Sequence, residues 1–250
     1  MLTIEYDGSE FHGWQRQPGL RTVQGVLEEA LSKVCGKAII IDGTSRTDSG
    51  VHALGQRASF KAEVGIPTDK IPFAVNNILA GGQNSIKGVG DLRIISIDEM
   101  DMDFHARFNC QKKTYRYVIL NSDIPNIFRR NYCYQVKDTL DVDAMKKAAK
   151  FLVGTHDFKS FQASGGNERE TTVRTISEIS IEKSGDDIAI HVTGDGFLYN
   201  MVRIIVGTLV EVGKGKRRPE DIVNIIDGED RALAGHTAPA SGLYLLEIFY

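Results

Sequence analysis

Apolar and polar residues follow two different periods along the chain, one typical of helices and one typical of strands. In residues 23–34 apolar side chains recur every three or four positions, which predicts an amphipathic helix. Thr22 is suited to cap this helix at its start, and Gly36 is suited to end it. In residues 56–63 apolar and polar side chains alternate instead, which predicts a half-buried strand. The chain therefore mixes helices and strands from its beginning.

The same two periods predict elements up to the last residue. Further strands are expected over 2–6, 39–41, 92–97, 115–120, 176–183, 188–193 and 243–250. Further helices are expected after a Thr68 cap, after an Asp141 cap up to Gly154, over about 198–212, and from Pro219 to Gly228. Strands and helices follow one another in two similar series. The pattern thus predicts an α/β (α+β) fold of two halves, residues 1–100 and 101–250.

Composition excludes several classes of protein but does not indicate a function. The 250 residues are 42% apolar and 25% charged, which excludes a disordered or fibrous chain and fits one large or two small domains. Cys35, Cys110 and Cys133 are few and widely spaced, so neither a disulfide framework nor a zinc site is expected. No apolar run approaches the roughly 20 residues of a membrane span. We therefore expect a protein of the cytoplasm, neither secreted nor embedded in a membrane.

The densest polar segment is GTSRTDSGVHALGQ, residues 43–56, which follows the expected strand 39–41. It brings Arg46, Asp48 and His52 close together in a loop, and such loops often carry chemistry. A simpler interpretation is a polar turn formed by Asp48 with Ser49 and Gly50. The spacing alone favours the turn.

A single arginine interrupts the most apolar helix. Arg203 lies within 198–212, where a helix would be buried on most sides, and an unpaired buried charge costs several kcal/mol. A carboxylate is therefore expected opposite it, and Asp48 or Asp195 are the candidates. Alternatively, the Arg203 guanidinium extends to water along its apolar stem.

The net charge of −3 conceals an uneven distribution. Residues 105–137 contain seven basic side chains, one acidic side chain and six aromatic rings, and residues 203–218 contain five basic side chains against Glu211. Residues 220–250 carry six acidic side chains and only Arg231. Basic and aromatic residues together favour binding of RNA phosphates and bases, although a plain amphipathic strand explains the alternation equally well. The six histidines show no metal-ligand spacing.

Five separated motifs resemble those of the tRNA pseudouridine synthases of the TruA type. They are YDGSEFHGWQRQ (6–17), SRTDSGVHALGQ (45–56), DFHARF with TYRY (103–117), FLYNMVRIIVG (197–207) and GLYL (242–245). They occur in the order of that family and span nearly the whole chain. Two other classes remain open: an RNA-binding module without catalysis, and a metal-dependent nuclease that uses Asp48 and His52.

The resemblance implies a role for five side chains. Asp48 would be the essential catalytic aspartate and nucleophile, and Arg203 would pair with it. Tyr115 would stack on the target base. Arg46 would hold the flipped nucleotide or the space that it leaves, and Leu245 would line the pocket.

The resemblance also implies an architecture and a substrate. Two similar ferredoxin/RRM-like halves would form a continuous, mostly antiparallel sheet with a central active-site cleft, and a homodimer would bind tRNA. The expected reaction is isomerisation of uridine to pseudouridine at nucleotides 38 to 40 of the anticodon arm, without a cofactor or metal. Two features depart from the family pattern: Ser45 where glycine is usual, and a longer loop at residues 81–90.

Overall fold

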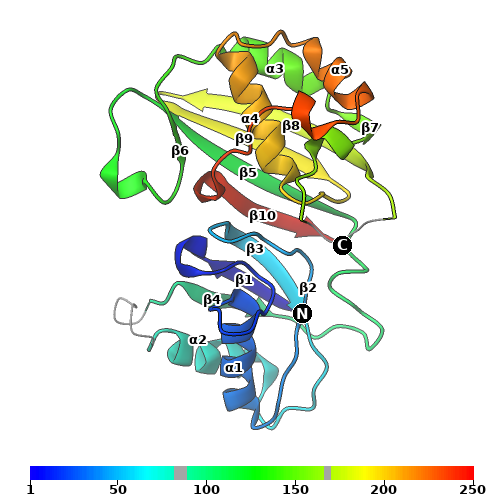
Figure 1. Ribbon diagram of the computed structural model, residues 1–250. Helices are drawn as coiled ribbons and strands as arrows, with labels where there is room; N and C mark the ends of the chain where they lie inside the picture. The colour runs from blue at the N-terminus through cyan, green and yellow to red at the C-terminus, as the bar shows by residue number, and fades with distance from the viewer. Residues whose placement is uncertain (82–88, 166–169) are drawn as a thin grey trace. The chain divides into compact units, whose positions relative to one another are not determined.

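The computed structural model describes residues 1–81, 89–165 and 170–250 (Figure 1). It divides into two compact units, one of residues 1–111 with 244–250 and the other of residues 112–243. The sequence places the boundary near residue 100 and the last strand in the second half. In the structure the last strand groups with the first unit, where it pairs with a strand of that unit.

The first unit contains a sheet in the order β4, β1, β3, β10, with β2 also beside β3. Its strands are β1 (Leu2–Tyr6), β2 (Asp42–Gly43), β3 (His52–Ser59), β4 (Leu92–Ile97) and β10 (Leu243–Phe249), and its helices are α1 (Val23–Cys35) and α2 (Ile71–Leu79). The pairs β1–β3, β1–β4 and β2–β3 are antiparallel, whereas β10 runs parallel to β3. Helices α1 and α2 pack against each other, and α2 also packs on β4 (Figure 1).

The second unit contains a sheet in the order β5, β9, β8, β7, in which neighbouring strands are antiparallel. Its strands are β5 (Lys112–Asn121), β6 (Tyr134–Val136), β7 (Gly154–Asp157), β8 (Val173–Ser184) and β9 (Asp187–Gly194), and its helices are α3 (Val142–Lys150), α4 (Met201–Gly213) and α5 (Asp221–Asp227). The short β6 runs parallel to β5. Helix α3 packs against α4 and β8. The α/β class with mostly antiparallel pairing is thus confirmed.

Two of the three predicted N-terminal helix caps are present in the structure. The Thr22 hydroxyl accepts the Gly25 N–H at the start of α1, and Gly36 ends that helix in the left-handed conformation. Asp141 accepts the Ala144 N–H in the same way at α3. The predicted Thr68 cap is wrong: residues 68–70 form a 3-10 turn before α2, and the Thr68 hydroxyl donates to Glu99.

The predicted strand over residues 39–41 is also wrong. Ile39 and Ile41 are buried as expected, but their N–H groups donate to the side chains of Ser32 and Glu28 on α1. Because helix side chains satisfy these donors, this segment needs no strand partner. The pattern also missed the short strands β2, β6 and β7.

The predicted loop at 81–90 lies mostly outside the described residues, since 82–88 are not among them. Within the described part of the chain, no helix has both the length and the apolar character that crossing a membrane requires.

Candidate active site

Asp48 lies on the loop that joins β2 to β3 in the first unit. The Asp48 carbonyl accepts the Val51 N–H at 3.2 Å, and Gly50 has a φ of +78°. The polar turn expected at Asp48 is therefore present. Asp48 is half-buried, whereas Arg46 is exposed between the buried Ser45 and Thr47.

Buried side chains hold the backbone of this loop from the side of the sheet. Gln56 is fully buried; its amide N–H donates to the Ser45 carbonyl at 2.7 Å and its oxygen accepts the Ser45 N–H at 3.3 Å. The Tyr6 hydroxyl is 2.7 Å from the Thr47 hydroxyl, which is next to Asp48. Fully satisfied buried polar networks of this kind make a structure rigid. We refer to Tyr6, Thr47 and Gln56 as the loop network.

Residues 8–14 hold the same loop from its other side. The Trp14 N–H donates to the Thr47 carbonyl at 3.0 Å, and the Ser49 hydroxyl donates to the Phe11 carbonyl at 3.2 Å. A Cβ atom on Gly43 would lie 2.3 Å from the Trp14 ring, so only glycine fits there. The first and second motifs therefore pack into one structure around Asp48.

Ser45, where the family pattern has glycine, fits this loop without strain. Both backbone groups of Ser45 are bonded to Gln56. Among the described residues, Asn200 and Glu229 alone combine a side chain with a positive φ, so position 45 does not require glycine.

Two further side chains of the first unit are buried. His52 is 2% exposed; its Nδ1 accepts the Gly8 N–H at 3.0 Å, and its ring stacks on Tyr244 with centroids 4.7 Å apart. This burial weighs against the nuclease hypothesis, in which His52 would act on RNA. Leu245 is fully buried on β10, opposite Ala53 of β3.

Tyr115 lies on β5 in the second unit, opposite Val192 of β9. The Tyr115 side chain is 6% exposed, and its ring meets Phe197 edge to face with centroids 5.2 Å apart and planes at 88°. This geometry is a favourable one for aromatic pairs. Phe197 begins the motif FLYN, and the sequence reasoning assigned it no role.

Arg203 lies near the start of α4, and nearly every other residue of that helix is buried. Its Nε donates to the Ala238 carbonyl at 2.7 Å, and its Nη1 donates to the Asn200 side-chain oxygen at 2.7 Å. Asn200 precedes the helix in the left-handed conformation, with a φ of 59°. These two bonds fix the orientation of the guanidinium.

Asp195, one candidate partner of Arg203, is engaged elsewhere. Its carboxylate accepts the Thr175 N–H at 3.1 Å, and it forms no ion pair with Arg203 in the described structure. The pairing of Arg203 with Asp48 stays a prediction.

The segment 235–239, which contributes Ala238, is itself anchored to α4. The Thr208 hydroxyl accepts the Gly235 N–H at 2.9 Å, and the Glu211 carboxylate accepts the His236 N–H at 3.1 Å. Burial raises the pKa of Glu211, but hydrogen bonds from Arg217 and His236 outweigh it and hold that pKa below its usual value. Glu211 is therefore a charged anchor for the segment that holds Arg203.

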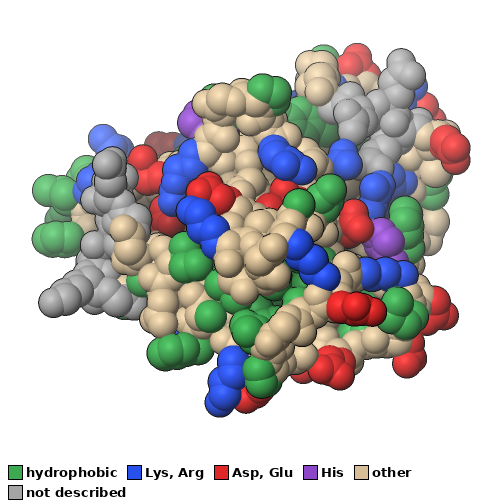
Figure 2. Space-filling model, turned by 90° about the horizontal axis from the view of Figure 1, so that it is seen from below, with side chains coloured by type: hydrophobic (Ala, Val, Ile, Leu, Met, Phe, Trp, Pro, Cys, Tyr) green, Lys and Arg blue, Asp and Glu red, His purple; other side chains and the backbone are tan. Residues whose placement is uncertain are grey.

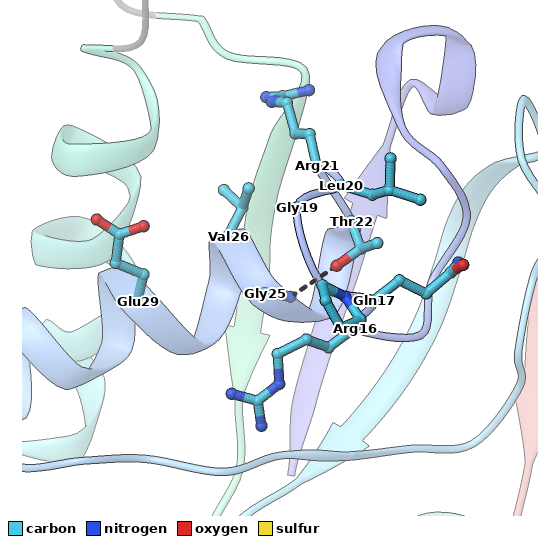
Figure 3. A pocket seen from close by; sticks show the side chains of 10 residues that line it. Arg16, Gln17, Gly19, Leu20, Arg21, Thr22, Gly25, Val26 and Glu29 are labelled. Carbon is cyan, nitrogen blue, oxygen red and sulfur yellow. Dashed lines mark hydrogen bonds between the residues drawn. The ribbon is translucent and has the colours of Figure 1, made fainter.

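A surface pocket of about 670 Å³ lies at the start of α1 (Figure 3). Residues 16–22 and the first two turns of α1 form its wall, and Arg16 and Arg21 point away from each other (Figure 3). Arg16 pairs with Glu28 at 3.1 Å and Arg21 pairs with Asp91 at 2.8 Å. Both arginine charges are balanced, so this pocket is a poor site for a phosphate.

The face shown in Figure 2 mixes charges of both signs. Lys and Arg side chains lie beside Asp and Glu side chains across it, with no broad area of one sign. Among the described residues, no group of three or more His, Cys, Asp or Glu side chains is placed to hold a metal ion.

Sequence comparison connects the chain, including the segments around Asp48 and Arg203, to known enzymes. The sequence profile of the tRNA pseudouridine synthase family matches residues 2–109 and 148–250. The chain belongs to this family. It is therefore an isomerase, and the expected conversion of uridine to pseudouridine in tRNA is confirmed.

Individual relatives in the family cover the whole chain. The chain is 49% identical to tRNA pseudouridine synthase A 2 of Clostridium tetani, over 100% of this chain and 97% of that one. It is 47% identical to tRNA pseudouridine synthase A of Acetivibrio thermocellus, over 100% of this chain and 98% of that one. A chain of a solved Cbf5–Nop10–Gar1 complex matches 85% of this chain and 54% of its own length, at 12% identity and a TM-score of 0.36.

Proposed function

We propose that this pseudouridine synthase modifies uridines 38 to 40 in the anticodon arm of tRNA, with Asp48 as its nucleophile. The observation that carries the proposal is the rigid loop around Asp48, which is built from the family's first two motifs. Full-length relatives named tRNA pseudouridine synthase A support the choice of substrate.

The reaction requires a nucleophile and no added group. The N1–C1′ glycosidic bond breaks, the base turns, and C5 bonds to C1′; C5 then releases its hydrogen as a proton and N1 gains a proton. Atoms and electrons balance without a redox cofactor, metal or nucleotide. An ionised carboxylate is suited to attack either the ribose or the pyrimidine ring. Asp48 supplies that carboxylate.

Arg203 and Tyr115 would serve the same nucleotide. A positive charge near a carboxylate favours its ionised form, and Arg203 presents a guanidinium that Asn200 and Ala238 already orient. A flipped uridine loses its stacking partners at a cost of a few kcal/mol, which an aromatic ring partly offsets. We assign this stacking to Tyr115.

Arg46 and Leu245 complete the proposed set. Arg46 extends into solvent from the Asp48 loop, so its charge is available to a phosphate or to the space that the flipped base leaves. Leu245 would form an apolar wall of the pocket. We further propose a cytoplasmic homodimer.

Chemical mapping of pseudouridine tests the reaction and the position together. Transfer RNA treated with the protein should gain pseudouridine at positions 38 to 40, and tRNA treated with Asp48→Asn should not. Modification at other positions would contradict the substrate assignment. Binding of tRNA without modification by either protein would leave an RNA-binding module instead. Sedimentation equilibrium tests the dimer, and a monomer at micromolar concentration would contradict it.

A further inference from the structure

The connection between β5 and β6 carries the most exposed aromatic side chain of the described structure. Phe128 is 90% exposed, and Ile124 and Ile127 on the same connection are 78% and 71% exposed. In Figure 1 this connection projects from the sheet of its own unit. Three large apolar side chains in one short segment form a patch that a partner would cover. We refer to residues 124–130 as the tip.

The tip is an ordered structure. Residues 127–129 form a 3-10 turn, and the Asn126 side chain caps this turn by accepting the Phe128 N–H at 3.1 Å. The Arg130 guanidinium donates to the Ile127 carbonyl at 2.8 Å. These bonds hold Phe128 in place, so binding through its ring would cost little ordering entropy.

The charged side chains near the tip indicate what kind of partner it binds. The connection between β5 and β6, residues 122–133, contains Arg129 and Arg130 and one acidic side chain, Asp123. Asp187 pairs with Arg129 at 2.7 Å, whereas Arg130 is exposed and follows Phe128 by two residues. An exposed ring next to guanidinium groups suits an unpaired nucleotide, whose base stacks on the ring and whose phosphate meets the charge.

Two other exposed phenylalanines differ from Phe128. Phe108 is 75% exposed, but its ring is already engaged by His105, with centroids 4.3 Å apart, and by Arg107 at 5.5 Å. Phe73 is 72% exposed, but it lies on α2, whose residues carry no charge.

We propose that the tip is a second contact for tRNA, in which Phe128 stacks on an unpaired base outside the site of isomerisation and Arg130 contacts a phosphate. This contact rests on the proposed tRNA substrate. It would strengthen binding and leave the chemical step unchanged, because Phe128 does not belong to the proposed catalytic set.

The test compares Phe128→Ser with the matched control Phe73→Ser. Filter binding with tRNA should show a dissociation constant raised about 5- to 150-fold for Phe128→Ser and unchanged for Phe73→Ser, since stacking of one base contributes on that scale. The single-turnover rate at saturating tRNA should match that of the native enzyme. Phe128→Trp should restore binding. Arg130→Ala should reduce the salt dependence of binding by about one phosphate contact.

Equal affinity of Phe128→Ser and native protein for tRNA would overturn the proposal. So would a loss of affinity that parallels a shift from dimer to monomer in sedimentation, because the tip would then bind a second copy of the chain. If the native protein binds tRNA through Phe128 and modifies no anticodon-arm uridine, the tip proposal stands and the proposed function fails.

Discussion

The two units orient their proposed functional side chains by different means. In the first unit Gln56 bonds to the backbone of Ser45 and the Tyr6 hydroxyl bonds to the Thr47 hydroxyl, and these contacts fix the loop that carries Asp48. In the second unit the bonds from Asn200 and Ala238 go directly to the guanidinium of Arg203. The aspartate is positioned through its loop, and the arginine through its own side chain.

This difference has a consequence for mutation. Loss of a support beneath the Asp48 loop displaces a backbone that several other bonds still hold. Replacement of Arg203, in contrast, directly removes the oriented guanidinium. We therefore expect the largest effects at the side chains proposed to meet the substrate, and graded effects at the residues that hold them.

Arg203→Lys should lower kcat about a hundredfold. Lysine keeps the charge, but it lacks the planar fork that bonds Asn200 and Ala238 simultaneously. Single-turnover isomerisation of tRNA measures the effect. Arg217→Lys is the matched control, since Arg217 pairs with Glu211 at 2.7 Å and is outside the proposed catalytic set. Similar rates for the two variants would remove the distinction between them.

Gln56→Leu should lower kcat about tenfold with little change in KM. Leucine leaves the buried Ser45 backbone groups without partners, and an unsatisfied buried group costs about 1–3 kcal/mol. Gln56→Glu should fail to rescue the rate, because a carboxylate accepts the Ser45 N–H but has no proton for the Ser45 carbonyl. A change in KM alone would show that Gln56 affects binding and not the position of Asp48. Exposed Gln17→Leu serves as the control.

Tyr6→Phe should have a smaller effect in the same direction, about threefold in kcat. It removes one hydroxyl that lies 2.7 Å from the Thr47 hydroxyl, and Thr47 keeps its backbone bond to Trp14. A larger decrease in kcat than that of Gln56→Leu would show that Tyr6 contributes more than Gln56 to positioning Asp48.

Glu211→Gln should mainly lower stability, by about 1 kcal/mol at pH 7. The folded-state pKa of Glu211 lies below its ordinary value of 4.5, so the charged form contributes stability above that value. This contribution is lost as the pH falls through the lower folded-state pKa. The difference in melting temperature between Glu211→Gln and native protein should thus shrink below about pH 4.5. A constant difference down to pH 3 would contradict the anchoring role of the charge.

Hydrophobic periodicity was sufficient to predict most of the elements. Helix α1 begins and ends where Thr22 and Gly36 predict, because caps are local signals. The strand expected at 39–41 failed because side chains of α1 satisfy its N–H groups, a tertiary contact that a local pattern does not contain. The last strand, expected in the second half, groups with residues 1–111 in the structure, and this grouping depends on tertiary contacts that a local pattern does not contain.

Candidate residues were easier to predict than their supports. Asp48 and Arg203 stood out as charges in apolar or strand-end surroundings. Gln56, Asn200 and Ala238 did not, although all but Ala238 lie inside the quoted motifs, because a neutral polar or small residue carries no signal until its bonding partner is known. The buried environment of Arg203 was inferred correctly, whereas the two neutral acceptors were not foreseen.

Release of tritium from tRNA labelled at C5 of uridine is the most direct measurement of the central claim, that Asp48 is the nucleophile of the isomerisation. Native protein should release tritium from the modified uridines, because C5 loses its hydrogen when it bonds to C1′. Asp48→Asn should fold and bind tRNA as the native protein does, yet release tritium at least about a thousandfold more slowly. Equal rates of release from the two proteins would contradict the claim.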